Sequence, residues 1–217
     1  MIALLISLPV LVFSIVLHEV AHGWAARWQG DNTAYMLGRL TLNPIPHIDP
    51  IGSILVPAIL SLMPGGLIFG WARPVPVNPR NFRNYKRGDI IVSLAGVVVN
   101  LILAILFIFV LAGAEWLVRF FPDMAASWQI LGAMAWYGVR INLVLMLFNL
   151  IPIPPLDGSH VFYYLLPVRW AVKYREIGMR GMVVLMVLLW FGGPILTAPL
   201  NWLFGAALAL KDLLVLA

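Results

Sequence analysis

Residues 90–114 read IIVSLAGVVVNLILAILFIFVLAGA, a run that contains no Asp, Glu, Lys or Arg. Crossing the hydrocarbon core of a bilayer as a helix takes about 20 apolar residues, so this run is long enough to span a membrane. Further charge-free runs cover residues 1–17, 51–72, 141–156 and 181–210. Because several such runs follow one another, the sequence predicts an all-α, polytopic membrane protein with about five to six membrane segments.

The composition excludes a water-soluble fold. Of the 217 residues, 62% are hydrophobic and 11% are charged, whereas a soluble domain carries about 25% charged residues. The chain has no cysteine, which excludes disulfides and thiolate metal sites. The net charge of +5 comes from basic residues beside apolar runs, which is typical of an orientation signal. We therefore expect the lipid bilayer, and no nucleic acid, as a partner.

The basic residues also predict the orientation of the chain. Nine of the 14 Lys and Arg residues form two clusters, and such clusters mark the cytosolic side of membrane proteins. We expect a multi-pass protein of the cell (inner) membrane, with the N-terminus outside and the first helix retained. The clusters are Arg73, Arg80, Arg83, Lys86 and Arg87, and Arg169, Lys173, Arg175 and Arg180.

The first apolar run ends in the sequence His18-Glu19-Val20-Ala21-His22. Residues i and i+4 of a helix share a face, so both imidazoles can bind one metal ion. Glu19 is then placed to act as a general base on a water molecule. A pair of helix histidines without a metal is the alternative, but ionisable residues inside a membrane span are costly and usually functional.

A third ligand is needed, and Asp157 is the first candidate. It ends an otherwise charge-free run whose prolines disfavour a regular helix, and irregular backbone at membrane depth lines a cavity or is buried in protein. An interfacial loop aspartate is the alternative interpretation. His160 and His47 are rival ligands. We expect His160 in the following helix and His47 in a cytosolic loop.

Three ordered motifs resemble the site-2 protease family of intramembrane zinc metalloproteases, in its small prokaryotic branch without a PDZ domain. The motifs are HEVAH at 18–22, SLAGVVVN at 93–100 and NLIPIPPLDG at 149–158. The cytosolic stretch GWARPVPVNPR at 70–80 is also similar to that branch.

The resemblance implies roles for individual residues. His18, His22 and Asp157 would bind one Zn²⁺ per chain, with Glu19 as the catalytic base. Asn149 would bind substrate backbone or polarise the scissile carbonyl, and Asn100 would line the active site. The alternative for Asn100 is a structural one, since Gly96 and its small neighbours also suit close helix packing.

Residues 51–72 pose a topological problem. Asp157 and the histidines must share one depth on the cytosolic side, which places residues 30–47 and 73–87 on the same face of the membrane. The apolar stretch between them cannot then be a single crossing, and it is too short to cross twice as helices. Pro57 and the sequence Pro64-Gly65-Gly66 favour a re-entrant hairpin; a plain span is the rival.

The segment that follows, Trp71 to Asn78, alternates Val and Pro and favours extended backbone. We expect a small β element here, whose edge at Val75 and Val77 binds an unwound substrate as an added strand. A proline-stiffened linker is the alternative.

These features together predict a single membrane-embedded domain over residues 1–217, with its core motifs within 1–160 and accessory segments in 161–217. The tail contains either two short spans or one span and an interfacial helix. The predicted activity is zinc-dependent hydrolysis of peptide bonds in transmembrane segments of single-pass proteins. A metal or proton transporter and a non-catalytic scaffold are the other classes; the sequence has no internal repeat, and a scaffold has no need of Glu19.

Overall fold

The computed structural model describes residues 2–55, 59, 71–191 and 193–216, and the regular secondary structure within these ranges is all helical. Within these ranges, four helices are long and apolar enough to cross a membrane: Leu5–Gln29, Tyr85–Phe120, Pro122–Asn149 and Thr197–Leu216. The prediction of a helical membrane protein is confirmed, while the predicted count of five to six membrane segments is not.

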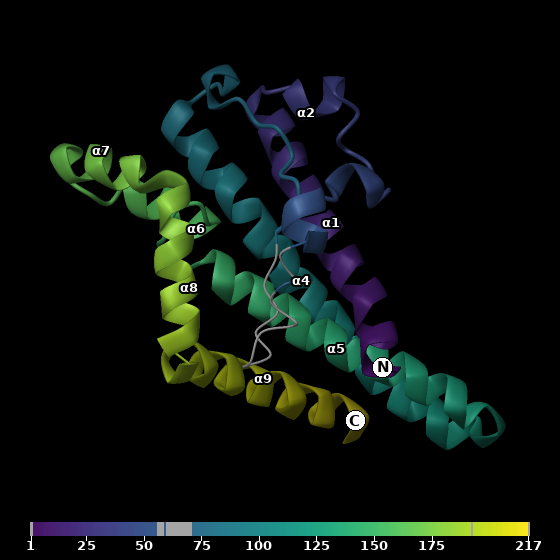
Figure 1. Ribbon diagram of the computed structural model, residues 1–217. Coiled ribbons are helices and arrows are strands. Elements are labelled where there is room, and N and C mark those ends of the chain that lie inside the picture. The colour runs from purple at the N-terminus through teal and green to yellow at the C-terminus, as the bar shows by residue number, and fades with distance from the viewer. Residues whose placement is uncertain (1, 56–58, 60–70, 192, 217) are drawn as a thin grey trace.

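Figure 1 shows the helices and their labels in chain order. The α-helices are α1 (Ile2–Gln29), α2 (Thr33–Met36), α4 (Tyr85–Phe120), α5 (Ala125–Asn149), α6 (Asp157–Tyr163), α7 (Val168–Ile177), α8 (Gly181–Phe191) and α9 (Gly193–Leu216). Single turns of other helix types are η1 (Ile45–His47), η2 (Pro50–Leu55), η3 (Pro79–Asn81), η4 (Pro122–Met124) and η5 (Gly178–Arg180).

Helices α1, α4 and α5 form the core of the molecule, with α4 packed along α5 and α1 against both. A glycine permits close approach of α4 and α5, because a Cβ at Gly138 would lie 2.4 Å from the ring of Phe107. The main apolar cluster joins α4, α5 and α9, and consists of Val97, Ala104, Ile108, Val139, Leu143, Met146 and Ala207. Other apolar side chains of α4, such as Leu106 and Phe109, face outward, as expected of a surface in contact with lipid.

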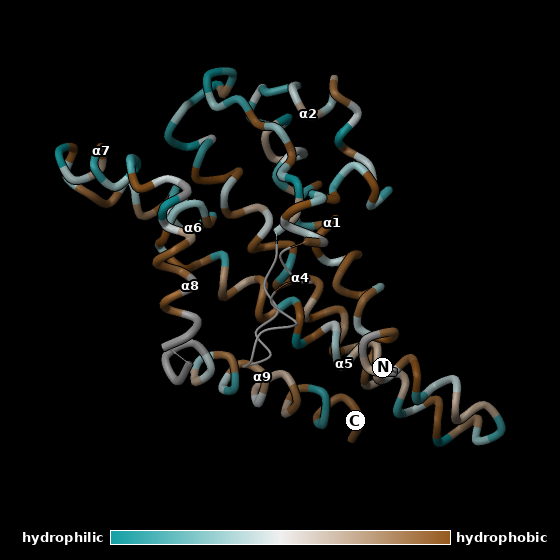
Figure 2. Tube along the Cα trace, in the orientation of Figure 1, coloured by the Kyte–Doolittle hydropathy of each residue, from teal (hydrophilic) through white to brown (hydrophobic). Residues whose placement is uncertain are grey.

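Apolar residues fill the middle of the bundle, and hydrophilic residues gather toward the end that carries α2 and α7 (Figure 2). At this end the N–H of Arg83 donates to the carbonyl oxygen of Gln29 over 2.8 Å. The N–H of Asn78 donates to Asp31 Oδ2 over 2.7 Å. The segments before and after residues 51–72 therefore lie side by side, as the topological argument requires. The predicted re-entrant turn falls mostly on 56–58 and 60–70, outside the described residues.

The predicted β element is not a strand: residues 71–78 belong to no strand, and the described residues contain none elsewhere. The segment is instead held by single hydrogen bonds to different partners. The N–H of Arg73 donates to His47 O over 2.9 Å, and that of Val75 donates to Glu19 Oε2 over 2.8 Å. Its proline-rich sequence accounts for this, because a residue without an N–H cannot contribute to a regular ladder.

After residue 180, the described part of the chain contains one helix of spanning length and one shorter helix. Helix α8 has 11 residues, too few to cross a bilayer, for which about 20 are needed. Helix α9 packs against α4 and α5 and includes Pro199. The division into a core within 1–160 and an accessory tail stays a prediction.

Candidate metal centre

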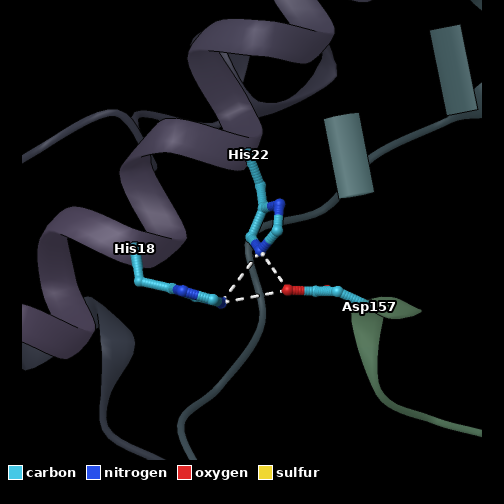
Figure 3. A group of neighbouring side chains, drawn as sticks. All are labelled: His18, His22 and Asp157. Carbon is cyan, nitrogen blue, oxygen red and sulfur yellow. Dashed lines mark hydrogen bonds and ion pairs between the residues drawn. The ribbon is translucent and has the colours of Figure 1, made fainter. Parts of the chain in front are cut away.

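His18 and His22 lie one turn apart on α1, and Asp157 is the first residue of α6. Their side chains point toward one another (Figure 3). The two Nε2 atoms are 3.0 Å apart, and Asp157 Oδ2 lies 3.3 Å from His18 Nε2 and 3.4 Å from His22 Nε2. Ligands about 2.0–2.1 Å from a tetrahedral zinc ion lie about 3.3 Å from one another. The triangle of donor atoms therefore has the dimensions of a zinc site.

Asp157 reaches this position because the chain turns sharply after α5. Helix α5 ends at Asn149, and the following segment folds back so that α6 begins against the end of α5. A Cβ at Gly158 would lie 2.3 Å from the carbonyl oxygen of Leu150. Only glycine fits this approach, which explains the Asp-Gly pair at the start of α6.

The ring of His22 is oriented by the backbone of α4. Its Nδ1 donates to the carbonyl oxygen of Val92 over 2.7 Å. A carbonyl oxygen is only an acceptor, so the proton of neutral His22 is on Nδ1 and the lone pair of Nε2 faces Asp157. This is the arrangement in which metal-binding histidines are usually held.

The ring of His18 is held by the Gly-x-x-x-Asn stretch of α4. The fully buried side-chain amide of Asn100 lies 3.1 Å from His18 Nδ1, and a Cβ at Gly96 would lie 2.4 Å from the imidazole. Gly96 thus makes room for the ring that Asn100 contacts. Asn100 Oδ1 has no hydrogen-bond partner; with the amide turned over, it would accept from Nδ1–H and leave Nε2 to a metal.

The donor set fits zinc. Asp157 Oδ2 is buried without a hydrogen-bond donor, and a buried carboxylate oxygen without a partner is costly unless a cation binds it. Two imidazoles and a carboxylate form a ligand set typical of catalytic zinc, with one position open.

Glu19 lies beside this group but not in it. Among the described residues, the group able to hold a metal consists of His18, His22 and Asp157. Glu19 Oε2 accepts the N–H of Val75 over 2.8 Å. The carboxylate is thus oriented by the extended segment next to the site, as a group that acts on water rather than on the metal would be.

The remaining predicted site residues are not among the three that form the triangle. Asn149 Nδ2 donates to Leu145 O in its own helix over 2.9 Å. Val75 is buried, with 6% of its surface exposed, and Val77 packs against the apolar cluster of Ala25, Ala26, Phe82 and Val92. The roles of Asn149, Val75 and Val77 toward a substrate stay predictions.

The two rival ligands are occupied elsewhere. His47 Nε2 lies 3.0 Å from Thr41 O. His160 is in α6, as expected, and its Nδ1 lies 3.2 Å from Asp89 Oδ1. Sequence reasoning did not identify Asp89 or the Val92 carbonyl. An acidic residue at the start of a long apolar run is a signal for Asp89, whereas a backbone carbonyl has none.

Fold and site together define a helical membrane protein with a zinc-type His–His–Asp centre. The model of peptidase family M50 matches residues 117–189, a stretch that includes Asp157. "Putative zinc metalloprotease YwhC" of Bacillus subtilis is 42% identical over 82% of this chain and 77% of its own length. The chain belongs to peptidase family M50, the site-2 protease family of zinc metalloproteases.

Two mycobacterial relatives agree with this assignment. "Putative zinc metalloprotease Rip2" of Mycobacterium tuberculosis H37Rv is 32% identical over 92% of this chain and 70% of its own length. The protein of the same name from Mycolicibacterium smegmatis is 30% identical over 68% of this chain and 52% of its own length. No solved structure matches the chain.

Proposed function

We propose that this protein is an intramembrane zinc endopeptidase that hydrolyses peptide bonds within transmembrane segments of single-pass membrane proteins. The observation that carries the proposal is the triangle of His18, His22 and Asp157 with Glu19 beside it, partly within a helix long enough to span a membrane. A carboxylate next to a His–His–Asp centre supports hydrolysis over simple metal storage.

The chemistry divides between the metal and the chain. When bound, one zinc ion per chain would supply Lewis-acid activation of water and of the scissile carbonyl at neutral pH. Glu19 takes the proton of the attacking water and delivers it to the leaving amine nitrogen. Val92 O and Asn100 hold the two imidazoles in place, so that the ligands need not reorganise during the reaction.

The substrate is proposed to be an unwound transmembrane helix, because a helix hides its peptide bonds. Asn149 would bind the backbone or the scissile carbonyl, and Val75 and Val77 would hold the extended chain. The basic clusters favour a site toward the cytosolic side of the inner membrane. These assignments rest on the sequence motifs and on the nearness of residues 71–78 to Glu19.

The test uses purified protein in liposomes together with single-pass membrane proteins as candidate substrates. Cleavage should disappear with a metal chelator and return with Zn²⁺. Glu19→Gln should lower cleavage by roughly 10²–10⁴-fold, the usual contribution of a general base, while the protein keeps about one zinc per chain. Glu176→Gln, at an exposed position of α7, is the matched control and should cleave normally.

Loss of zinc in Glu19→Gln would show that this residue is a ligand and not a base. Zinc transport across the liposome membrane without cleavage of any substrate would favour the transporter instead.

A further inference from the structure

Asp89 is a buried carboxylate outside the metal centre, near the start of α4, with 4% of its surface exposed. Its Oδ2 accepts the hydroxyl of Tyr164 over 2.8 Å, and its Oδ1 lies 3.2 Å from His160 Nδ1. Burying a carboxylate is costly unless it is paired and hydrogen-bonded. Asp89 therefore holds both partners, and both belong to the segment that begins at Asp157.

Helix α6 depends on such contacts for its position. It has only 7 residues, and an isolated helix of this length is unstable in water because nucleation is unfavourable. Asp157, His160 and Tyr164 are spaced three and four residues apart, so they share one face of the helical turn. That face lies against α4, the principal neighbour of α6.

The same helix α4 also holds both histidine ligands. Val92 O binds the ring of His22, and Asn100 contacts the ring of His18. Asp89 lies about one turn before Val92 on this helix. A contact at Asp89 thus fixes α6 to the element that already positions the imidazoles, and it sets the distance from Asp157 to them.

The burial of Asp89 favours a stable contact with His160 and Tyr164 over a weak ion pair at the protein surface. The Asp89 side chain is 6% exposed, whereas that of His160 is 43% exposed, toward a pocket of about 210 Å³ that Arg175 and Tyr163 also line. Burial and the hydrogen bond to Asp89 raise the pKa of the Tyr164 phenol above its ordinary value. Tyr164 consequently keeps the proton that it donates.

We propose that Asp89 is a positioning residue for the metal centre: by binding His160 and Tyr164 it fixes α6 so that Asp157 reaches the two imidazoles. The inference rests on the proposed role of Asp157 as a ligand. It does not require that a substrate be known, because its consequence is measured on the metal alone.

The experiment measures the affinity of the purified full-length protein for Zn²⁺ by chelator competition, and the visible spectrum of its Co²⁺ form. Asp89→Ala should weaken Zn²⁺ binding about tenfold to a hundredfold, as loss of an outer partner of a ligand does, and should alter the Co²⁺ spectrum. Asp89→Asn should restore most of the affinity, because an amide can accept from Tyr164 and donate to His160.

A matched control separates positioning from general loss of stability. Asp31 is also buried, and it accepts hydrogen bonds from Asn78 N and Asn81 Nδ2, which lie outside α6. Asp31→Ala should lower the unfolding temperature and leave the Zn²⁺ affinity of the folded protein unchanged. If Asp89→Ala does not fold, the double variant His160→Gln/Tyr164→Phe takes its place, with the same weakening expected.

The outcomes distinguish the two proposals. Unchanged Zn²⁺ affinity and Co²⁺ spectrum in folded Asp89→Ala, or in the double variant, would overturn the positioning role while Asp157→Ala still weakens binding. Unchanged affinity in Asp157→Ala would overturn the metal centre itself, and the positioning role with it.

Discussion

The backbone N–H of Val75 donates to the Glu19 carboxylate over 2.8 Å, across 56 positions of sequence. This bond joins the extended segment to the residue proposed as the base. Close approach at this point is possible because a Cβ at Gly23 would lie 2.9 Å from Val75 Cγ1. The segment proposed to hold substrate is therefore also the segment that orients Glu19.

Val75→Pro removes this donor and should lower cleavage at least about tenfold, because general-base catalysis depends on placement of the base. Zinc content should not change, since Val75 is not one of the three proposed ligands. Cleavage of a single-pass substrate and metal analysis on the same preparation give both values.

Pro74→Val is the control for Val75→Pro. It adds an N–H one position away and leaves the bond to Glu19 in place, so its effect should be mild. A well-folded Val75→Pro enzyme that cleaves normally would mean that residues 71–78 are only a stiff linker.

Asp157→Ala leaves two imidazoles, so Zn²⁺ affinity should fall by more than about a hundredfold. This loss exceeds the one expected when only a hydrogen-bond partner of a ligand is removed. Cleavage should fall with it at limiting Zn²⁺. Asp123→Ala, at an exposed site in η4, should have no effect on either. Tight Zn²⁺ binding by the Asp157 variant would show that another residue is the third ligand.

The two predicted asparagines should separate metal binding from substrate binding. Asn100→Leu removes the partner of His18 Nδ1, so Zn²⁺ affinity should drop about tenfold to a hundredfold. Asn149→Ala should retain the metal, because Asn149 is not among the three residues that could hold it and its amide donates to Leu145 O. It should lower kcat/KM, as expected of a residue proposed to bind substrate. The reverse pattern, with metal lost only in the Asn149 variant, would contradict both assignments.

Cysteine labelling can test the membrane topology, since the chain has no cysteine of its own. Asn32→Cys and Asn84→Cys should be labelled from the same face, because Arg83 N bonds to Gln29 O beside them. Asp123→Cys, between α4 and α5, should be labelled from the opposite face. Labelling of positions 32 and 84 from opposite faces would require residues 51–72 to span the membrane.

The sequence by itself determined the class of protein and its principal metal-site candidates. Long charge-free runs predict a bundle of membrane helices. Inside the bilayer, every backbone N–H and C=O group must be hydrogen-bonded within the protein, and a helix achieves this. His18 and His22 are four residues apart, and residues at this spacing lie on the same face of an α-helix. Asp157 was also a candidate from sequence, because it is a rare carboxylate at the end of an apolar run.

Only the tertiary structure decided which groups support that site. The partners of the two imidazoles are Val92 O and an amide on α4, and Asp89 binds residues more than 70 positions away. Backbone donors and acceptors have no sequence signature, so the use of Val75 N–H by Glu19 could not be predicted. Such contacts depend on where long helices cross, and crossing is decided by packing over the whole bundle.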